Sequence, residues 1–135
     1  MNEFPSPAAS APRFTMVVLL IEDLARSLAF YRRLGVAFPA DADERTDVQV
    51  PIGDQHQLVL TTTFARYLPD HEPPSGGSRA ILEFFVDGND AVDAKYAELI
   101  DAGYRGRREP FLTGFGAYMG IVDDPDANTV LITAG

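Results

Sequence analysis

The sequence gives nearly the same pattern twice, and this internal repeat constrains the fold more than any single motif. An apolar strand at 16–21 runs into a helical pattern that contains Tyr31, and a second apolar strand at 80–86 runs into a helical pattern that contains Tyr96. The two patterns align at a single offset of 65 positions, 31 against 96. Two small units that pack together leave a cleft between them, where we expect a functional site.

Each half of the repeat is predicted to contain one helix and four strands. In the first half the helix is expected at 24–34, capped by Asp23, and the strands at 14–21, 36–38, 47–51 and 57–63. In the second half the helix is expected at 91–102 and the strands at 79–86, 104–109, 116–122 and 128–133. The predicted class is therefore α+β, with two β-α-β-β-β modules that form a curved mixed sheet (a half-barrel) around a cleft and carry the helices on its outer face.

Proline, glycine and serine mark the segments outside these modules. Residues 1–12 are predicted to be a disordered tail rather than a signal peptide, and 64–78 is predicted to be a linker. The modules are accordingly assigned to 13–63 and 79–135. No run approaches about 18 apolar residues, so no membrane span is expected. The chain has no cysteine, which excludes thiolate chemistry and favours a cytoplasmic location.

The charge balance bears on the partner. The 135 residues include 20 acidic and 11 basic side chains, for a net charge of −9. Such a surface repels nucleic acid, so a nucleic-acid partner is not expected. It would attract a cationic ligand at long range, although acidity that only keeps a protein in solution is the plainer explanation.

Two motifs resemble those of the vicinal oxygen chelate superfamily, which includes glyoxalase I, extradiol dioxygenases, fosfomycin resistance proteins and bleomycin resistance proteins. The first is D-L-x-x-S-x-x-F-Y-x-x-L-G at 23–35, and the second is D-P-D-x-N at 124–128. The resemblance covers residues 13–134 and implies the paired modules described above. Ala127 stands where the family usually has glycine, but we expect the turn to form because Asn128 tolerates unusual backbone angles.

Metal-dependent members of that superfamily hold the ion with His or Glu at four inward-facing strand positions. The resemblance maps these positions onto Met16, Thr61 (or Val59, in the same register), Ile81 and Leu131. Apolar and hydroxyl side chains do not hold a divalent cation, so we expect no metal site and no other cofactor. The two histidines, His56 and His71, are expected at the surface.

Strand alternation predicts a mostly apolar trough on the face that would otherwise carry the metal ligands. The predicted ligand-binding residues are Met16, Val18, Thr61, Phe64, Ile81, Glu83, Phe85, Tyr118 and Leu131. The alternative is that these side chains simply fill the face of the sheet. The loop aromatics among them suit stacking on a planar ligand and equally suit a core or a subunit contact.

Glu83 is the carboxylate of this predicted trough, and it allows two interpretations. It anchors a cationic or hydrogen-bond-donating ligand, or acts as the general base of an enzyme, and on that account it is the one catalytic candidate. In the other interpretation it pairs with an arginine, for which the nearest candidates are Arg79, Arg105 and Arg107.

The resemblance implies three functions, of which we favour the first. The chain is similar to the metal-free bleomycin-resistance branch, whose members sequester drugs, confer antibiotic resistance and pair as homodimers with clefts between the subunits. Its partners would be a small organic ligand, cationic or aromatic, and a second copy of the chain. The alternative is an enzyme of the same fold (a lyase, isomerase or dioxygenase-like protein) that uses Glu83 or a metal carried by its ligand. The third is a regulatory or structural partner without catalysis.

Overall fold

The computed structural model describes residues 13–69, 71–72 and 80–134, so the predicted tail and part of the predicted linker lie outside the described residues. Its helices and strands are β1 (Met16–Leu20), α1 (Leu24–Arg33), β2 (Asp47–Pro51), β3 (Gln57–Thr61), β4 (Ile81–Phe85), α2 (Asn89–Asp101), β5 (Gly106–Leu112), β6 (Tyr118–Asp123) and β7 (Thr129–Ala134). Two short 3-10 helices are η1 (Ala42–Glu44) and η2 (Phe64–Tyr67).

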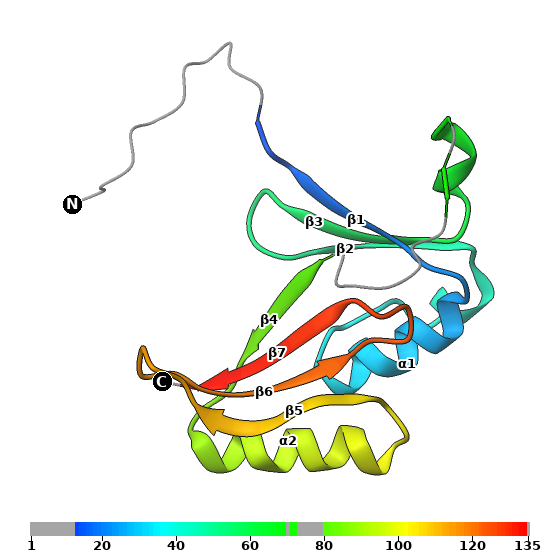
Figure 1. The fold of residues 1–135 in the computed structure, drawn as a ribbon. Helices are drawn as coiled ribbons and strands as arrows, with labels where there is room; N and C mark the ends of the chain where they lie inside the picture. The colour runs from blue at the N-terminus through cyan, green and yellow to red at the C-terminus, as the bar shows by residue number, and fades with distance from the viewer. Residues whose placement is uncertain (1–12, 70, 73–79, 135) are drawn as a thin grey trace.

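The strands form two open, curved sheets, which confirms the predicted α+β class (Figure 1). The first sheet has the strand order β1-β3-β2, and the second has the order β4-β7-β6-β5. In each sheet the first strand of the module runs parallel to the last one, and the remaining pairs are antiparallel. The sheets are separate hydrogen-bonded units, and β1 and β4 are each an edge strand.

One predicted strand does not form, and the first sheet therefore has three strands where the second has four. Residues 36–38 are irregular and lead through Pro39 into η1. The backbone N–H of Val36 donates to the Tyr31 carbonyl at 3.1 Å and so ends α1. Val36 and Phe38 pack against the core instead of pairing with β2. Proline at the next position lacks an N–H for a ladder, which removes a donor that a fourth strand would need.

Helix α1 begins as predicted, because the side chain of Asp23 accepts a hydrogen bond from the Arg26 backbone N–H at 3.3 Å. Leu24, Leu28 and Tyr31 of α1 are buried, and so are Ser27 and Phe30. The ring of Phe30 meets that of Tyr104, from the second module, edge-on at 4.9 Å. Helix α1 is thus covered on two sides, by its own sheet and by the second module.

Helix α2 packs along the second sheet and also contacts α1. It lies against β5, β6 and β7 (Figure 1). The ammonium of Lys95 donates to the Arg33 carbonyl at the end of α1 at 2.7 Å, and to Glu98 at 2.9 Å. A single hydrophobic core therefore runs through both modules. Among the described residues, no helix has both the length and the apolarity needed to cross a bilayer.

Tyr96 on α2 repeats Tyr31 in sequence but lies across two glycines of the second sheet. A methyl group added at Gly106 would collide with the Tyr96 hydroxyl and lie 2.9 Å from Ile100 Cδ1. One added at Gly120 would lie 3.1 Å from a Tyr96 ring carbon. Glycine at these positions lets the helix approach the sheet closely.

We predict that Gly106→Ala lowers the free energy of unfolding by about 1–3 kcal/mol, because the extra methyl group overpacks the contact with Tyr96. Urea denaturation followed by circular dichroism measures this change. The control is Gly114→Ala, where an added methyl group meets no atom within 4 Å. Equal stability of the two variants would contradict the close packing of Tyr96.

Candidate functional site

The two motifs that carry the family resemblance contact each other in the structure. The hydroxyl of Tyr31, on α1, donates to the Asp124 carboxylate at 2.6 Å, and both residues are buried. Burial above all, and then the charge of Asp124, raise the pKa of Tyr31 far above its usual value. The phenol therefore stays protonated and acts as a donor. Nothing in the spacing of the sequence assigns these two residues to each other.

Asp124 organises the turn between β6 and β7. One of its oxygens accepts from the backbone N–H groups of Asp126 and Asn128 at 2.9 and 2.8 Å, and the other accepts from Tyr31 and from the Asn128 side chain at 2.6 and 2.9 Å. These four hydrogen bonds satisfy a carboxylate that is only 4% exposed. Asp124 therefore joins the modules and is not available to a ligand.

Asp126 makes a second link across the contact between the two modules, which we call the junction. It accepts from the Glu22 backbone N–H at 3.1 Å and from the Ser27 hydroxyl at 3.2 Å. Partial burial, more than any other cause, raises the pKa of Asp126, and the negative charge of Asp124 adds to the effect. The junction thus contains two neighbouring carboxylates, and partial burial makes the ionised form of Asp126 less favourable than it is in water.

The turn adopts its unusual backbone angle at Ala127 and not at Asn128. Ala127 has a φ of 67°, the left-handed region that alanine adopts at a cost of about 1–2 kcal/mol. The turn forms as expected, but the strain falls on the alanine that replaces the usual glycine. The hydrogen bonds to Asp124 on both sides of this residue hold it in place.

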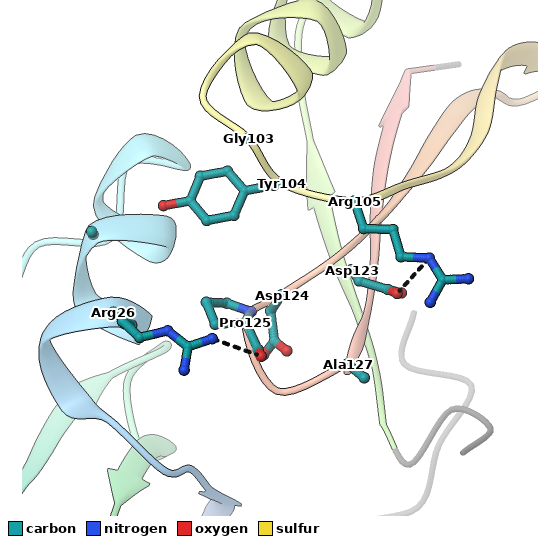
Figure 2. Close-up of a pocket in the computed structure, with 9 residues that line it drawn as sticks. Arg26, Gly103, Tyr104, Arg105, Asp123, Asp124, Pro125 and Ala127 are labelled. Atoms are coloured by element: carbon teal, nitrogen blue, oxygen red, sulfur yellow. Dashed lines mark hydrogen bonds and ion pairs between the residues drawn. The ribbon is translucent and has the colours of Figure 1, made fainter. Parts of the chain in front are cut away.

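A pocket of about 470 Å³ lies beside this turn, between α1 and the segment that enters β5 (Figure 2). It is lined by Arg26, Ala29, Gly103, Tyr104, Arg105, Asp123, Asp124, Pro125 and Ala127. Asp123 is buried and pairs with Arg107 at 3.1 Å and with Arg105 at 3.8 Å. Arg26 donates to the Pro125 carbonyl at 3.4 Å. Figure 2 shows the side chains of Arg26 and Arg105 on opposite sides of the turn, so they do not converge on one point. We interpret this pocket as part of the junction.

The predicted trough corresponds to the sheet face that points away from the core. On β1, Met16 and Val18 are exposed at 39% and 38%, whereas Leu19, whose side chain lies on the other face of the strand, is buried. On β4, Ile81 and Phe85 are exposed at 66% and 65%. In β4 and β7, Glu83 is in register with Leu131, which places these two side chains on the same face. Six of the predicted residues thus lie on the outward faces of the two sheets, and these faces are mostly apolar. We call them the open face.

Thr61 also lies on the open face, because it is in register with Leu20 of β1. Its hydroxyl, however, already makes hydrogen bonds within the protein. It donates to the Asp47 carboxylate and accepts from the backbone N–H of Phe64 at 3.1 Å. Asp47 also accepts from the Thr63 hydroxyl at 2.9 Å. The hydrogen bond from Thr61, more than any other cause, holds the pKa of Asp47 below its usual value. The analysis of the sequence did not identify Asp47. The only signal for it is its position opposite Thr61 in the hairpin.

The two predicted aromatic residues lie in different places. Phe64 begins η2 at the end of β3, is 45% exposed, and has its ring 5.4 Å from that of Tyr67. Tyr118 lies on the helix side of β6, where its hydroxyl donates to Asp93 of α2 at 2.6 Å. The structure therefore does not bring Tyr118 together with the other predicted residues. Gly120, two positions along β6, faces α2 in the same way.

Glu83 is exposed on the open face and accepts one hydrogen bond, from the Thr133 hydroxyl at 3.1 Å. Of the arginines considered as its partners, Arg105 and Arg107 pair with Asp123, and Arg79 lies outside the described residues. None of the ion pairs between described residues includes Glu83.

The positions mapped from metal-dependent relatives do not fit a divalent cation. Met16, Ile81 and Leu131 offer no hard ligand, and the Thr61 hydroxyl is engaged by Asp47. Among the residues that the structure describes, no group of three or more His, Cys, Asp or Glu is arranged to hold a metal. His56 and His71 are exposed and lie apart from these positions in the sequence.

Comparison with known families supports the resemblance of the two motifs. The model of the Glyoxalase/Bleomycin resistance protein/Dioxygenase superfamily matches residues 13–132, nearly the whole described chain. A search of curated proteins finds no match. The superfamily resemblance is thereby confirmed, while the match does not single out the metal-free branch.

Solved structures show the same fold at low sequence identity. A hypothetical protein from S. aureus superposes with a TM-score of 0.76 at 20% identity, covering 94% of this chain and 96% of that one. A glyoxalase-related enzyme from Fulvimarina pelagi gives 0.75 at 19% identity, with 93% and 89% covered. A lactoylglutathione lyase from Agrobacterium tumefaciens gives 0.64 at 20% identity, with 96% of each chain covered.

We predict that Asp126→Asn becomes relatively more stabilising as the pH rises. The folded-state pKa of Asp126 is raised, so the native state favours its protonated form, and this contribution is lost as the pH rises from about 3.8 through the folded-state pKa. Asparagine keeps an acceptor for Glu22 and can donate to Ser27. Urea denaturation of variant and wild type at pH 3.5 and pH 7 measures the difference. A stability difference that is the same at both pH values, or smaller at pH 7, would contradict the raised pKa.

Proposed function

Because this chain belongs to the Glyoxalase/Bleomycin resistance protein/Dioxygenase superfamily, we propose that it binds a small organic molecule on the open face without a protein-bound metal. The observation that carries the proposal is the exposure of large apolar side chains on the outward faces of two edge strands. Met16 and Val18 on β1, with Ile81 and Phe85 on β4, are all more than a third exposed. Apolar surface gathered in this way marks a binding surface more often than a solvated one.

We propose further that the binding cleft is completed by a second copy of the chain, through the edges of β1 and β4. The other two edges are protected: β2 begins with Asp47 and ends with Pro51, and β5 contains Pro110 and a charged run with shifts in its register. Charges, proline and bulges are the devices that block edge pairing. Strand β1 has neither a charge nor a proline, and Glu83 is the only charged residue of β4.

The backbone of these edges supports the same proposal. Alternate residues of β1 bond to β3, as the contacts of Thr15 and Ile21 show at 2.9 and 3.0 Å, which leaves the N–H and C=O groups of Met16 and Val18 facing the free edge. In β4, Ala80 and Val86 bond to β7 at 2.9 and 2.8 Å, so Ile81, Glu83 and Phe85 face the free edge in the same way. Met16, Val18, Ile81 and Phe85 thus offer apolar side chains together with backbone groups that no described strand pairs.

Glu83 favours one alternative, an enzyme that uses this carboxylate as a general base or acts through a metal carried by its ligand. The supporting observation is an exposed carboxylate on an apolar face, oriented by Thr133. In that case Glu83→Gln abolishes turnover while it leaves substrate affinity within about tenfold. In the binding protein that we favour, no turnover accompanies binding.

We predict that Ile81→Gln weakens binding of the neutral dye Nile red about five- to tenfold, because it removes an apolar contact of the open face. Fluorescence titration measures the affinity, and thermal unfolding shows that the variant remains folded. The control is Ile52→Gln, since Ile52 is 51% exposed between β2 and β3 and lies off the open face. If both variants bind the dye as the wild type does, the open face is not the binding surface.

We predict that the wild type is a dimer and that Val18→Lys shifts it toward the monomer, because lysine on an edge strand opposes pairing. Sedimentation velocity over a hundredfold range of protein concentration measures the association. Ile52→Lys adds the same charge outside the two edges and should leave the dimer intact. A wild type that remains monomeric at the highest concentration would overturn the proposed second-copy contact.

A further inference from the structure

Among the described residues, Glu83 is a carboxylate of the open face that has no cation beside it. Asp123 pairs with two arginines, Glu98 with Arg33 and Lys95, and the two acidic residues around η1, Asp41 and Asp43, with one arginine each. Glu83 has only the hydroxyl of Thr133, which donates to one of its two carboxylate oxygens. The other oxygen makes no hydrogen bond within the described chain.

The lack of a described ionic partner for Glu83 becomes important once the open face is covered, because its neighbours are apolar. Ile81 and Phe85 flank it on β4, and Leu131 lies next to it on β7. An ionised carboxylate that is removed from water among such side chains needs a positive or strongly donating partner, because burial without one costs several kcal/mol. Whatever occupies this face must therefore either avoid Glu83 or neutralise it.

The described cations of the second module cannot move into this role without breaking other contacts. Arg105 and Arg107 hold the buried carboxylate of Asp123, which would lose its partners. Arg108 lies over the ring of Phe111, with its guanidinium carbon 3.5 Å from the ring centroid. Lys95 is bound to the end of α1. None of these described cations is free to neutralise Glu83, so we take the neutralising charge to come with the occupant.

We infer that the molecule bound on the open face is an organic cation, with an apolar body that lies on Ile81 and Phe85 and a positive or N–H-bearing group that meets Glu83. This inference rests on the proposed binding function and names its ligand class. The net charge of −9 acts in the same direction, because it raises the local concentration of cations around the whole protein. The Thr133 hydroxyl engages one oxygen of Glu83, which leaves the other as an acceptor for the ligand.

A competing explanation assigns Glu83 a protective role. A charge that points inward on an edge strand prevents unwanted strand pairing, and β4 is such an edge. In that case Glu83→Gln would promote aggregation and would not change the choice between a cationic and a neutral ligand. The two explanations therefore predict different results for one variant.

The experiment uses two dyes with the same fused aromatic core, the cationic Nile blue and the neutral Nile red, titrated by fluorescence at 0.15 M salt. The wild type is expected to bind Nile blue at least about tenfold more tightly than Nile red, the ratio expected from one charge-assisted hydrogen bond. Glu83→Gln is expected to remove this preference and to change the affinity for Nile red by no more than about twofold. The control, Glu109→Gln, removes an equal charge from β5 at the opposite edge of the same sheet and should keep the preference.

Each other outcome overturns a stated part of the argument. If Nile red binds and Nile blue binds no more tightly, the inferred ligand class is wrong while the binding function stands. If Glu83→Gln keeps the preference, or Glu109→Gln loses as much of it, the selectivity comes from the overall charge and Glu83 has no specific role. If neither dye binds the wild type, and Ile81→Gln changes nothing, the proposed function fails together with the inference.

Discussion

The rest of the structure depends on the buried carboxylate of Asp124. It gathers donors from its own turn and from α1, and so fixes both the shape of the turn and the position of the helix that packs on it. Removing one donor would leave a buried charge partly unsatisfied, which costs more than a hydrogen bond contributes on average. Because α1 is held on this side of the molecule and α2 packs on the same side of its own sheet, the opposite faces of both sheets stay uncovered by helices. The open face is therefore a consequence of the junction.

The internal repeat is used asymmetrically. Tyr31 and Tyr96 occupy equivalent positions, yet the first ends on a carboxylate of the other module and the second lies flat over the glycines of its own sheet. The two equivalent helices thus have different structural roles: α1 joins the modules, and α2 covers a sheet. The missing fourth strand of the first module belongs to the same asymmetry, since Val36 and Phe38 enter the core in its place. A repeat in sequence indicates common architecture, and the contacts at the junction decide how each copy is used.

Local patterns in the sequence were sufficient to predict most elements and the faces of the strands. Strand β2 lies at 47–51 as predicted, Asp23 caps α1, and the alternation along β1 and β4 separates core from open face. Features set by long-range contacts were not predictable in this way. Tyr118 is predicted among the loop aromatics that flank the trough, but it lies on β6, where its hydroxyl donates to Asp93 of α2. Tyr31, which donates to Asp124, lies 93 positions away, and the sequence alone carries no signal that joins the two residues.

The junction has one more consequence, which concerns the route of the chain. The hydrogen bonds by which Asp124 and Asp126 hold Tyr31, Ser27 and Glu22 run between the two modules, and none of these three involves the segment that connects the modules. The same bonds would form with equal geometry if α1 came from one polypeptide and the turn from another. The recognition between the halves is therefore indifferent to covalent continuity, in the manner of two subunits. The length of the connection decides whether two halves meet within one molecule or are exchanged between molecules. The chemistry of the junction is the same in both cases.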